Sequence, residues 1–122
     1  MLAQAFSEVQ QAMGVTPQNT TDPLAFSIQD TGRLTFEVGD QEVLISLAIP
    51  LMPYDSETMA KAYALAGVDQ KGPYPLWVGH YNDSLVLITA TPDRGVAGKD
   101  LLQAAEFLID LSANVSQVRN DS

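Results

Sequence analysis

The chain has 122 residues, 46% of them hydrophobic, with six basic against fifteen acidic residues and a formal net charge of −9 at pH 7. Six scattered cations cannot form the clustered positive surface that phosphate backbones need, which argues against nucleic acid and anionic membranes as partners. The absence of cysteine excludes disulfides and thiolate chemistry and suits a reducing cytoplasm.

The N-terminal residues start with a helical pattern and carry no export signal. Met1–Gly14 contains Glu8 but no Lys or Arg, so it lacks the basic start of a secretory signal, and no stretch of the chain is long and apolar enough to span a bilayer. Leu2, Phe6, Val9 and Met13 recur at helical spacing, and Gly14 marks the end of this helix. We expect one cytoplasmic domain, residues 1–122, without membrane insertion.

Three runs of alternating apolar and polar or small residues follow, at 24–29, 34–38 and 43–51. Turn signals at Asp30-Thr31-Gly32 and Gly39-Asp40 separate them. This pattern predicts three antiparallel strands in a meander, with one face of each strand buried.

An alanine-rich helix is predicted between Asp55 and Gly67, where small side chains let another element approach closely. Two further strands, 76–81 and 85–91, flank the hairpin signal Asn82-Asp83-Ser84. Both faces of these strands are apolar, whereas a small monomer normally leaves one sheet face in water. The surplus apolar surface predicts burial against another protein chain.

A final helix is predicted after the loop at 92–99, where Asp100 and Gln103 resemble a capping box. Its apolar face is broad, and the residues from Arg119 to Ser122 are expected to fray. The element order is α-β-β-β-α-β-β-α. The predicted class is α+β, a two-layer domain with a twisted antiparallel sheet and helices.

The side chains that could carry chemistry give little support to an enzyme. His80 is the only histidine, on a predicted strand with no obvious nucleophile beside it. Gly95 to Lys99 lies between a strand and a helix, but its two glycines are too close together for a phosphate loop, and Asp100 replaces the magnesium-binding Ser or Thr. We expect no catalytic residues, no metal site and no cofactor.

Several apolar residues have two interpretations at this stage. Trp77 is either a core residue or an anchor in a subunit interface. The apolar residues of the first helix and first strands are either core, the safer assignment from periodicity alone, or the lining of a groove for an extended partner segment. These candidate partner-binding residues are Phe6, Val9, Leu24, Phe26, Ile28, Leu34 and Phe36.

With these elements in order, the chain resembles the class I type III secretion chaperones, the family of the Tir and Yop effector chaperones. The resemblance covers most of the chain through diffuse apolar motifs. It is carried by Asp30-Thr31-Gly32-Arg33-Leu34-Thr35-Phe36, Val43-Leu44-Ile45-Ser46-Leu47, Leu76-Trp77-Val78, Leu85-Val86-Leu87, Leu101-Leu102 and Ala105-Glu106-Phe107-Leu108.

The resemblance implies a bacterial cytoplasmic homodimer that binds the extended, non-globular N-terminal segment of a secreted effector. The acidic surface would keep the loaded complex soluble. The dimer would form through the second helix and the fourth strand, and the implied interface residues are Met59, Tyr63, Leu65, Tyr74, Trp77 and Val78.

Two other hypotheses remain open from the sequence. A regulatory or adaptor module of the same fold would bind a folded protein partner. A small-ligand enzyme or carrier would be built around His80 and the nearby tyrosines.

Overall fold

The computed structural model describes residues 2–16, 23–28, 31–50, 75–81 and 84–120, and its elements confirm the predicted α+β class. The predicted helix between Asp55 and Gly67 lies outside the described residues. The described elements are α1 (Leu2–Ala12), β1 (Leu24–Ile28), β2 (Gly32–Val38), β3 (Glu42–Pro50), β4 (Trp77–Tyr81), β5 (Ser84–Pro92) and α3 (Gly98–Asn120).

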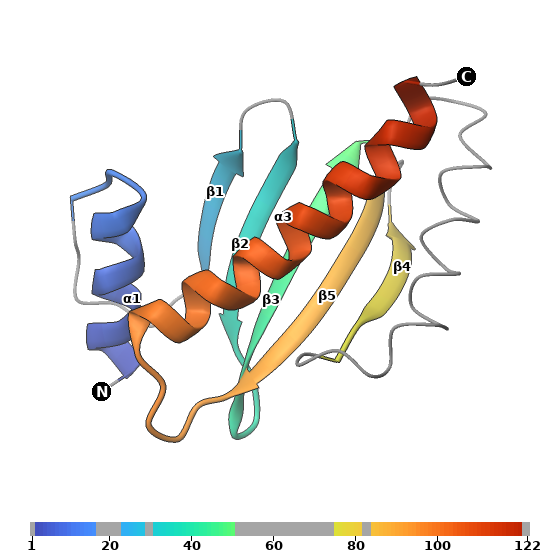
Figure 1. Cartoon of the computed structure of the whole chain (residues 1–122). Coiled ribbons are helices and arrows are strands. Elements are labelled where there is room, and N and C mark those ends of the chain that lie inside the picture. The colour runs from blue at the N-terminus through green and yellow to red at the C-terminus, as the bar shows by residue number, and fades with distance from the viewer. Residues whose placement is uncertain (1, 17–22, 29–30, 51–74, 82–83, 121–122) are drawn as a thin grey trace.

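The five strands form one antiparallel sheet in the order β1-β2-β3-β5-β4. The predicted meander and the predicted hairpin are both confirmed. The hairpin enters the sheet through its second strand, so β5 pairs with β3 and β4 forms an edge (Figure 1). The central strand β5 is apolar on both faces, whereas the edge strand β4 contains Gly79 and His80.

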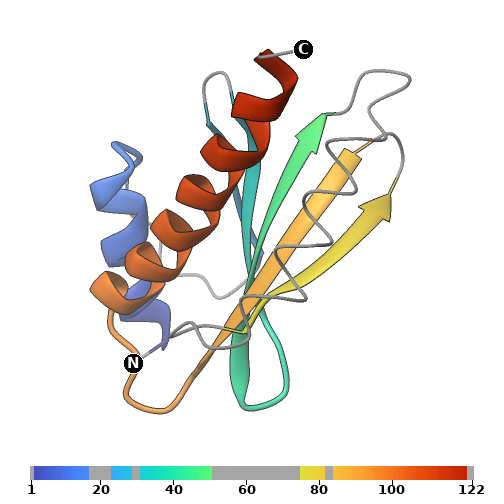
Figure 2. The same cartoon turned by 45° about the vertical axis from the view of Figure 1, so that its right-hand side comes forward.

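The two described helices, α1 and α3, lie on one face of the sheet, which we call the inner face. α3 crosses it diagonally and packs over β3 and β5, while α1 packs against the beginning of α3 near β1 (Figures 1 and 2). The inner-face residues of the strands alternate strictly with outer-face residues, as a half-buried sheet requires.

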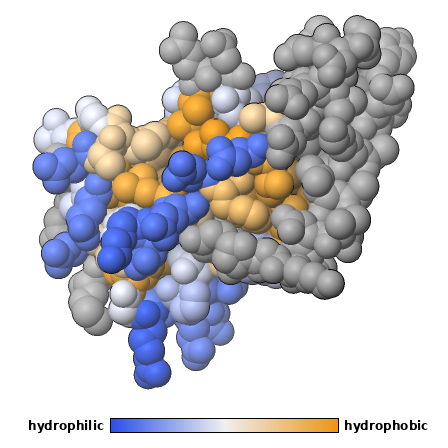
Figure 3. Space-filling model, viewed as in Figure 1, coloured by the Kyte–Doolittle hydropathy of each residue, from blue (hydrophilic) through white to orange (hydrophobic). Residues whose placement is uncertain are grey.

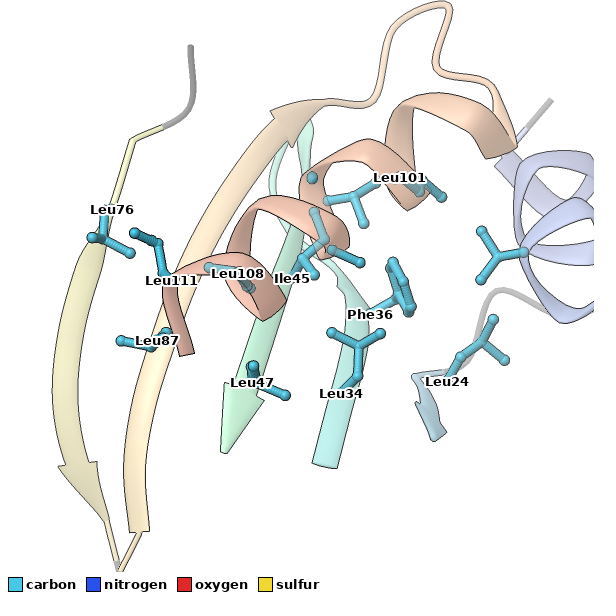
Figure 4. Close-up of a cluster of buried hydrophobic side chains, with 14 of the residues drawn as sticks. Leu24, Leu34, Phe36, Ile45, Leu47, Leu76, Leu87, Leu101, Leu108 and Leu111 are labelled. Carbon is cyan, nitrogen blue, oxygen red and sulfur yellow. The ribbon is translucent and has the colours of Figure 1, made fainter. Parts of the chain in front are cut away.

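One hydrophobic core joins the two layers (Figure 4). α3 contributes the small and branched residues of its central stripe, and α1 contributes three residues that are at most 1% exposed. The fully buried large side chains are Phe6, Val9, Leu34, Phe36, Val43, Ile45, Leu47, Leu85, Leu87, Leu101 and Leu108.

Gly14 ends α1, as the sequence predicts. It has a φ of 79°, a left-handed conformation that costs little only for glycine. Its N–H donates to the carbonyl of Gln11 at 3.1 Å, and the N–H of Val15 donates to the carbonyl of Gln10 at 2.9 Å. These two bonds form a Schellman motif, which satisfies the last carbonyls of α1 within the helix itself.

We expect Gly14→Ala to lower the free energy of unfolding by about 1 kcal/mol, because a Cβ disfavours the left-handed region. No other atom lies within 4 Å of that Cβ position, so the effect is backbone strain alone. Urea denaturation would measure it. Gln11→Ala, at an exposed position of the same helix, is the control and should change stability by no more than about 0.5 kcal/mol. Equal stability of the two variants would contradict the assignment.

The start of α3 differs from the prediction. The predicted capping box, with Asp100 before the helix and Gln103 inside it, is wrong, because the helix begins at Gly98. Asp100 is the third helical residue, and its Oδ2 accepts a hydrogen bond of 2.9 Å from the N–H of Ala97. Asp100 therefore supplies the second half of a capping box, the half that an acidic residue normally supplies.

Candidate protein-binding surfaces

The outer face of the sheet changes character from one edge to the other. A single row of cross-strand neighbours runs from Trp77 on β4 through Ile88, Ser46 and Thr35 to Ala25 on β1. The β4 end of this row is large and apolar, and the β1 end is small or polar. Only the β1 half therefore has the composition of a sheet face that is exposed to water.

We call the apolar half of this face the outer patch. Trp77 is 51% exposed and Tyr81 is 71% exposed, while the aliphatic members are half-buried. The residues of the outer patch are Leu44, Ala48, Trp77, Tyr81, Val86 and Ile88.

Gly79 lies between the two aromatic residues of the outer patch, opposite Val86. A Cβ at this position would meet no atom within 4 Å, so space remains open between Trp77 and Tyr81. Two exposed aromatic side chains separated by an open position are suited to receive a side chain of a partner.

The interpretation of Trp77 as a core residue is wrong for the single chain, since half of its surface is exposed. Val78, the next candidate interface residue, is half-buried and packs against the core from the inner face. The remaining candidate interface residues, Met59, Tyr63, Leu65 and Tyr74, lie outside the described residues.

The seven candidate partner-binding residues divide into two groups. Phe26 and Ile28 are partly exposed on the inner face of β1, and the ring of Phe26 meets that of Phe36 edge to face at 6.1 Å. The other five are at most 8% exposed and belong to the core of the chain: Phe6, Val9, Leu24, Leu34 and Phe36.

Phe26 and Ile28 belong to a second set of partly exposed apolar residues that pack on the core, which we call the flank strip. Gly98, Leu102 and Ile109 lie on one stripe of α3, and Gly98 on that stripe contacts α1. At its beginning the stripe therefore faces α1, on which Met13 is a partly exposed apolar residue. The flank strip consists of Met13, Phe26, Ile28, Leu102 and Ile109.

Figure 3 shows apolar side chains on both sides of the polar ridge of α3. Glu106 and Asp110 are exposed on this ridge, next to the Leu102–Ile109 stripe. An apolar strip bordered by carboxylates suits a partner that is apolar and basic.

The sequence predicts a broad apolar face for the last helix but does not separate Leu102 and Ile109 from its core residues. It also does not identify Met13, Leu44 or Ala48 as surface residues. One sequence feature could have indicated that some of these residues are exposed: the apolar face of the last helix is broader than one sheet can cover.

β1 is the other edge of the sheet, and it has no charged residue or proline within Leu24–Ile28. Charged side chains and proline are the usual protection against pairing with a further strand. The unprotected edge lies beside Phe26 and Ile28, so an extended segment could pair with β1 and contact the flank strip together.

The described residues offer little for catalysis. Within them no three His, Cys, Asp or Glu side chains are grouped as a metal site would need, and His80 is exposed on the edge strand. In the part of the chain that the structure covers, no helix combines the length and the apolar character needed to cross a membrane.

Comparison by sequence finds no matching family model and no matching curated protein. Comparison by structure finds the Yersinia pestis type III secretion chaperone SycH, in complex with a fragment of YscM2, with a TM-score of 0.68 and 12% identity over 94% of this chain and 99% of that chain. The HopA1–SchA chaperone–effector complex matches with a TM-score of 0.67 and 12% identity over 93% of this chain and 91% of that chain.

Two further structures share the fold. The heterodimeric ExoU–SpcU complex of the Pseudomonas aeruginosa type III secretion system matches with a TM-score of 0.61 and 15% identity, covering 90% of this chain and 93% of that chain. YbjN from E. coli, described as a candidate transcription regulator, matches with a TM-score of 0.59 and 13% identity over 93% of this chain and 88% of that chain. The chain thus has the class I chaperone-like fold of type III secretion chaperones, as its sequence pattern predicts.

Proposed function

We propose that this chain is a non-enzymatic type III secretion chaperone of the bacterial cytoplasm. It binds the non-globular N-terminal segment of a secreted effector and keeps that segment soluble. The observation that carries the proposal is the pair of apolar surfaces, the outer patch and the flank strip, on a chain whose fold is shared with chaperones in complex with their partners. Two separate surfaces suit two kinds of occupant.

The outer patch is where a second copy of the chain would bind. It includes the edge strand β4, which carries the exposed aromatic residues Trp77 and Tyr81, residue types that dominate interface energetics. A self-complementary surface on one face is what a two-fold dimer requires. Burial of this patch would explain why both faces of β5 are apolar.

The flank strip is where the effector segment would bind. An extended segment that pairs with the β1 edge presents every second side chain to the inner face, next to Phe26 and Ile28. Carboxylates beside the strip and a net charge of −9 favour a segment with basic residues between its apolar ones.

A second candidate function is a regulatory or adaptor module that binds a folded protein. It is favoured by the shared fold of YbjN, which is described as a candidate transcription regulator. The two functions differ in the state of the partner, because a chaperone binds an extended segment and an adaptor binds an assembled surface.

The test is to isolate the complex from the native cell and digest it with a nonspecific protease. The chaperone function predicts protection of one continuous segment near the partner's N-terminus, and that segment should be disordered when released. If the protected region is a folded domain that keeps its circular dichroism spectrum after release, the result supports the adaptor function instead.

A further inference from the structure

α1 buries Phe6 and Val9 in the core and makes its tightest contact with α3 at Gly98, the first residue of that helix. A Cβ on Gly98 would overlap the Cβ of Glu8 and lie 3.2 Å from the carbonyl oxygen of Ala5. The two helices therefore approach here with no room for a side chain on α3. Among the described residues, α1 packs on α3 more than on any strand.

A hydrogen bond crosses the same contact. The N–H of Gly98 donates to Oε1 of Glu8 at 3.4 Å, while the preceding N–H, that of Ala97, donates to Asp100 at 2.9 Å. A carboxylate is favoured at a helix N-terminus, where unpaired N–H groups carry partial positive charge. The carboxylate of Glu8 thus connects α1 to the N–H of Gly98, which has no hydrogen-bond acceptor within its own helix.

The other end of α1 is placed differently. In both views its C-terminal end lies away from α3, beyond the crossing with the α3 first turn (Figures 1 and 2). Val15 is 44% exposed, and Met13 is a partly exposed member of the flank strip. The Schellman motif at Gly14 closes the helix within itself, so α1 can move without losing its terminal hydrogen bonds.

We propose that α1 moves as a unit about the Gly98 contact, and that its Met13 end is a movable wall of the flank strip. The second clause rests on the proposed function, since it assigns the flank strip to a partner segment. Phe6 and Val9 are fully buried, so the closed position dominates in the free chain. A partner that supplies apolar side chains in their place would favour the open position.

Amide hydrogen exchange of the free chain tests this movement without any partner, so its result is independent of the proposed function. The amides of α1 should exchange through a local opening, faster than those of β3 and β5. Gly98→Ala should raise α1 exchange about tenfold or more and leave β3 and β5 unchanged, because overpacking strains only this contact.

Two other variants complete the test. Glu8→Ala removes the hydrogen-bond acceptor of the Gly98 N–H without adding volume. It should also raise the exchange rate of the α1 amides, by a smaller factor than Gly98→Ala. This variant keeps the test possible if Gly98→Ala fails to fold. Leu108→Ala, in the shared core, should accelerate α1 and the strands equally. The proposal is overturned if α1 exchanges at the same rate as β3 and β5 in the unmodified chain. It is also overturned if Gly98→Ala and Glu8→Ala each accelerate exchange equally in α1, β3 and β5.

Discussion

The variant Trp77→Asp is expected to prevent formation of the proposed dimer and to leave the chain as a monomer or as an aggregate. Trp77 is 51% exposed in the single chain and is the largest apolar side chain of the outer patch. Loss of a central aromatic anchor typically weakens an interface by about 2 kcal/mol or more, which is roughly thirtyfold in the dissociation constant. A buried, unpaired carboxylate on each subunit adds a further penalty. Sedimentation velocity across a concentration series would measure the change.

Thr35→Asp is the matched control for this variant. Thr35 lies in the same cross-strand row of the outer face, but on the polar half near β1. The same charge placed there should leave the dimer intact. If the Trp77→Asp chain is folded by circular dichroism and remains as dimeric as the Thr35→Asp chain, the outer patch is not the subunit interface.

The surplus of apolar residues in the later strands could be predicted from sequence, but its location could not. The turn signal between residues 76–81 and 85–91 predicts a hairpin, and the apolar residues on both faces of these strands predict two apolar faces; both are present. Alternation does not reveal that β5, rather than β4, pairs with β3. That order places Trp77 on an edge strand and leaves it exposed, because edge strands have a neighbour on one side only.

Core and surface residues of the first strand could not be separated from its pattern. Leu24, Phe26 and Ile28 occupy equivalent inner-face positions, yet only Leu24 is buried. The difference depends on how far α1 and α3 extend over β1, which is a property of helix packing and not of the strand. For the same reason Phe6 and Val9 belong to the core, although a groove lining has the same helical spacing.

The first residue of the last helix could not be predicted from the sequence either, for a different reason. Aspartate before an apolar run is a frequent N-cap residue, and Asp100 fits that pattern. The same residue type is also favoured inside the first turn, where it accepts the N–H of Ala97. Sequence alone does not separate these positions, and the choice shifts the predicted start of the helix by two to three residues.

Replacement of Ile28 by aspartate should strongly weaken partner binding while the proposed dimer persists. Ile28 is partly exposed in the flank strip and far along the sheet order from β4. An aspartate there removes an apolar contact and adds negative charge to an already acidic surface, so binding of a basic, apolar segment should weaken by roughly thirtyfold or more. Co-purification with the partner from the native cell and titration of its isolated segment would measure the loss.

Ser27→Asp supplies the comparison, because Ser27 is the adjacent residue of β1 and points to the outer face. It introduces the same charge on the same edge strand without altering the flank strip, so partner binding should persist. Ile28→Ala, which shortens the side chain without adding charge, should give a smaller loss in the same direction. Equal loss of binding in Ser27→Asp and Ile28→Asp would mean that the partner contacts the β1 edge through its backbone alone. Unchanged binding in both Ile28 variants would exclude the flank strip as the partner site.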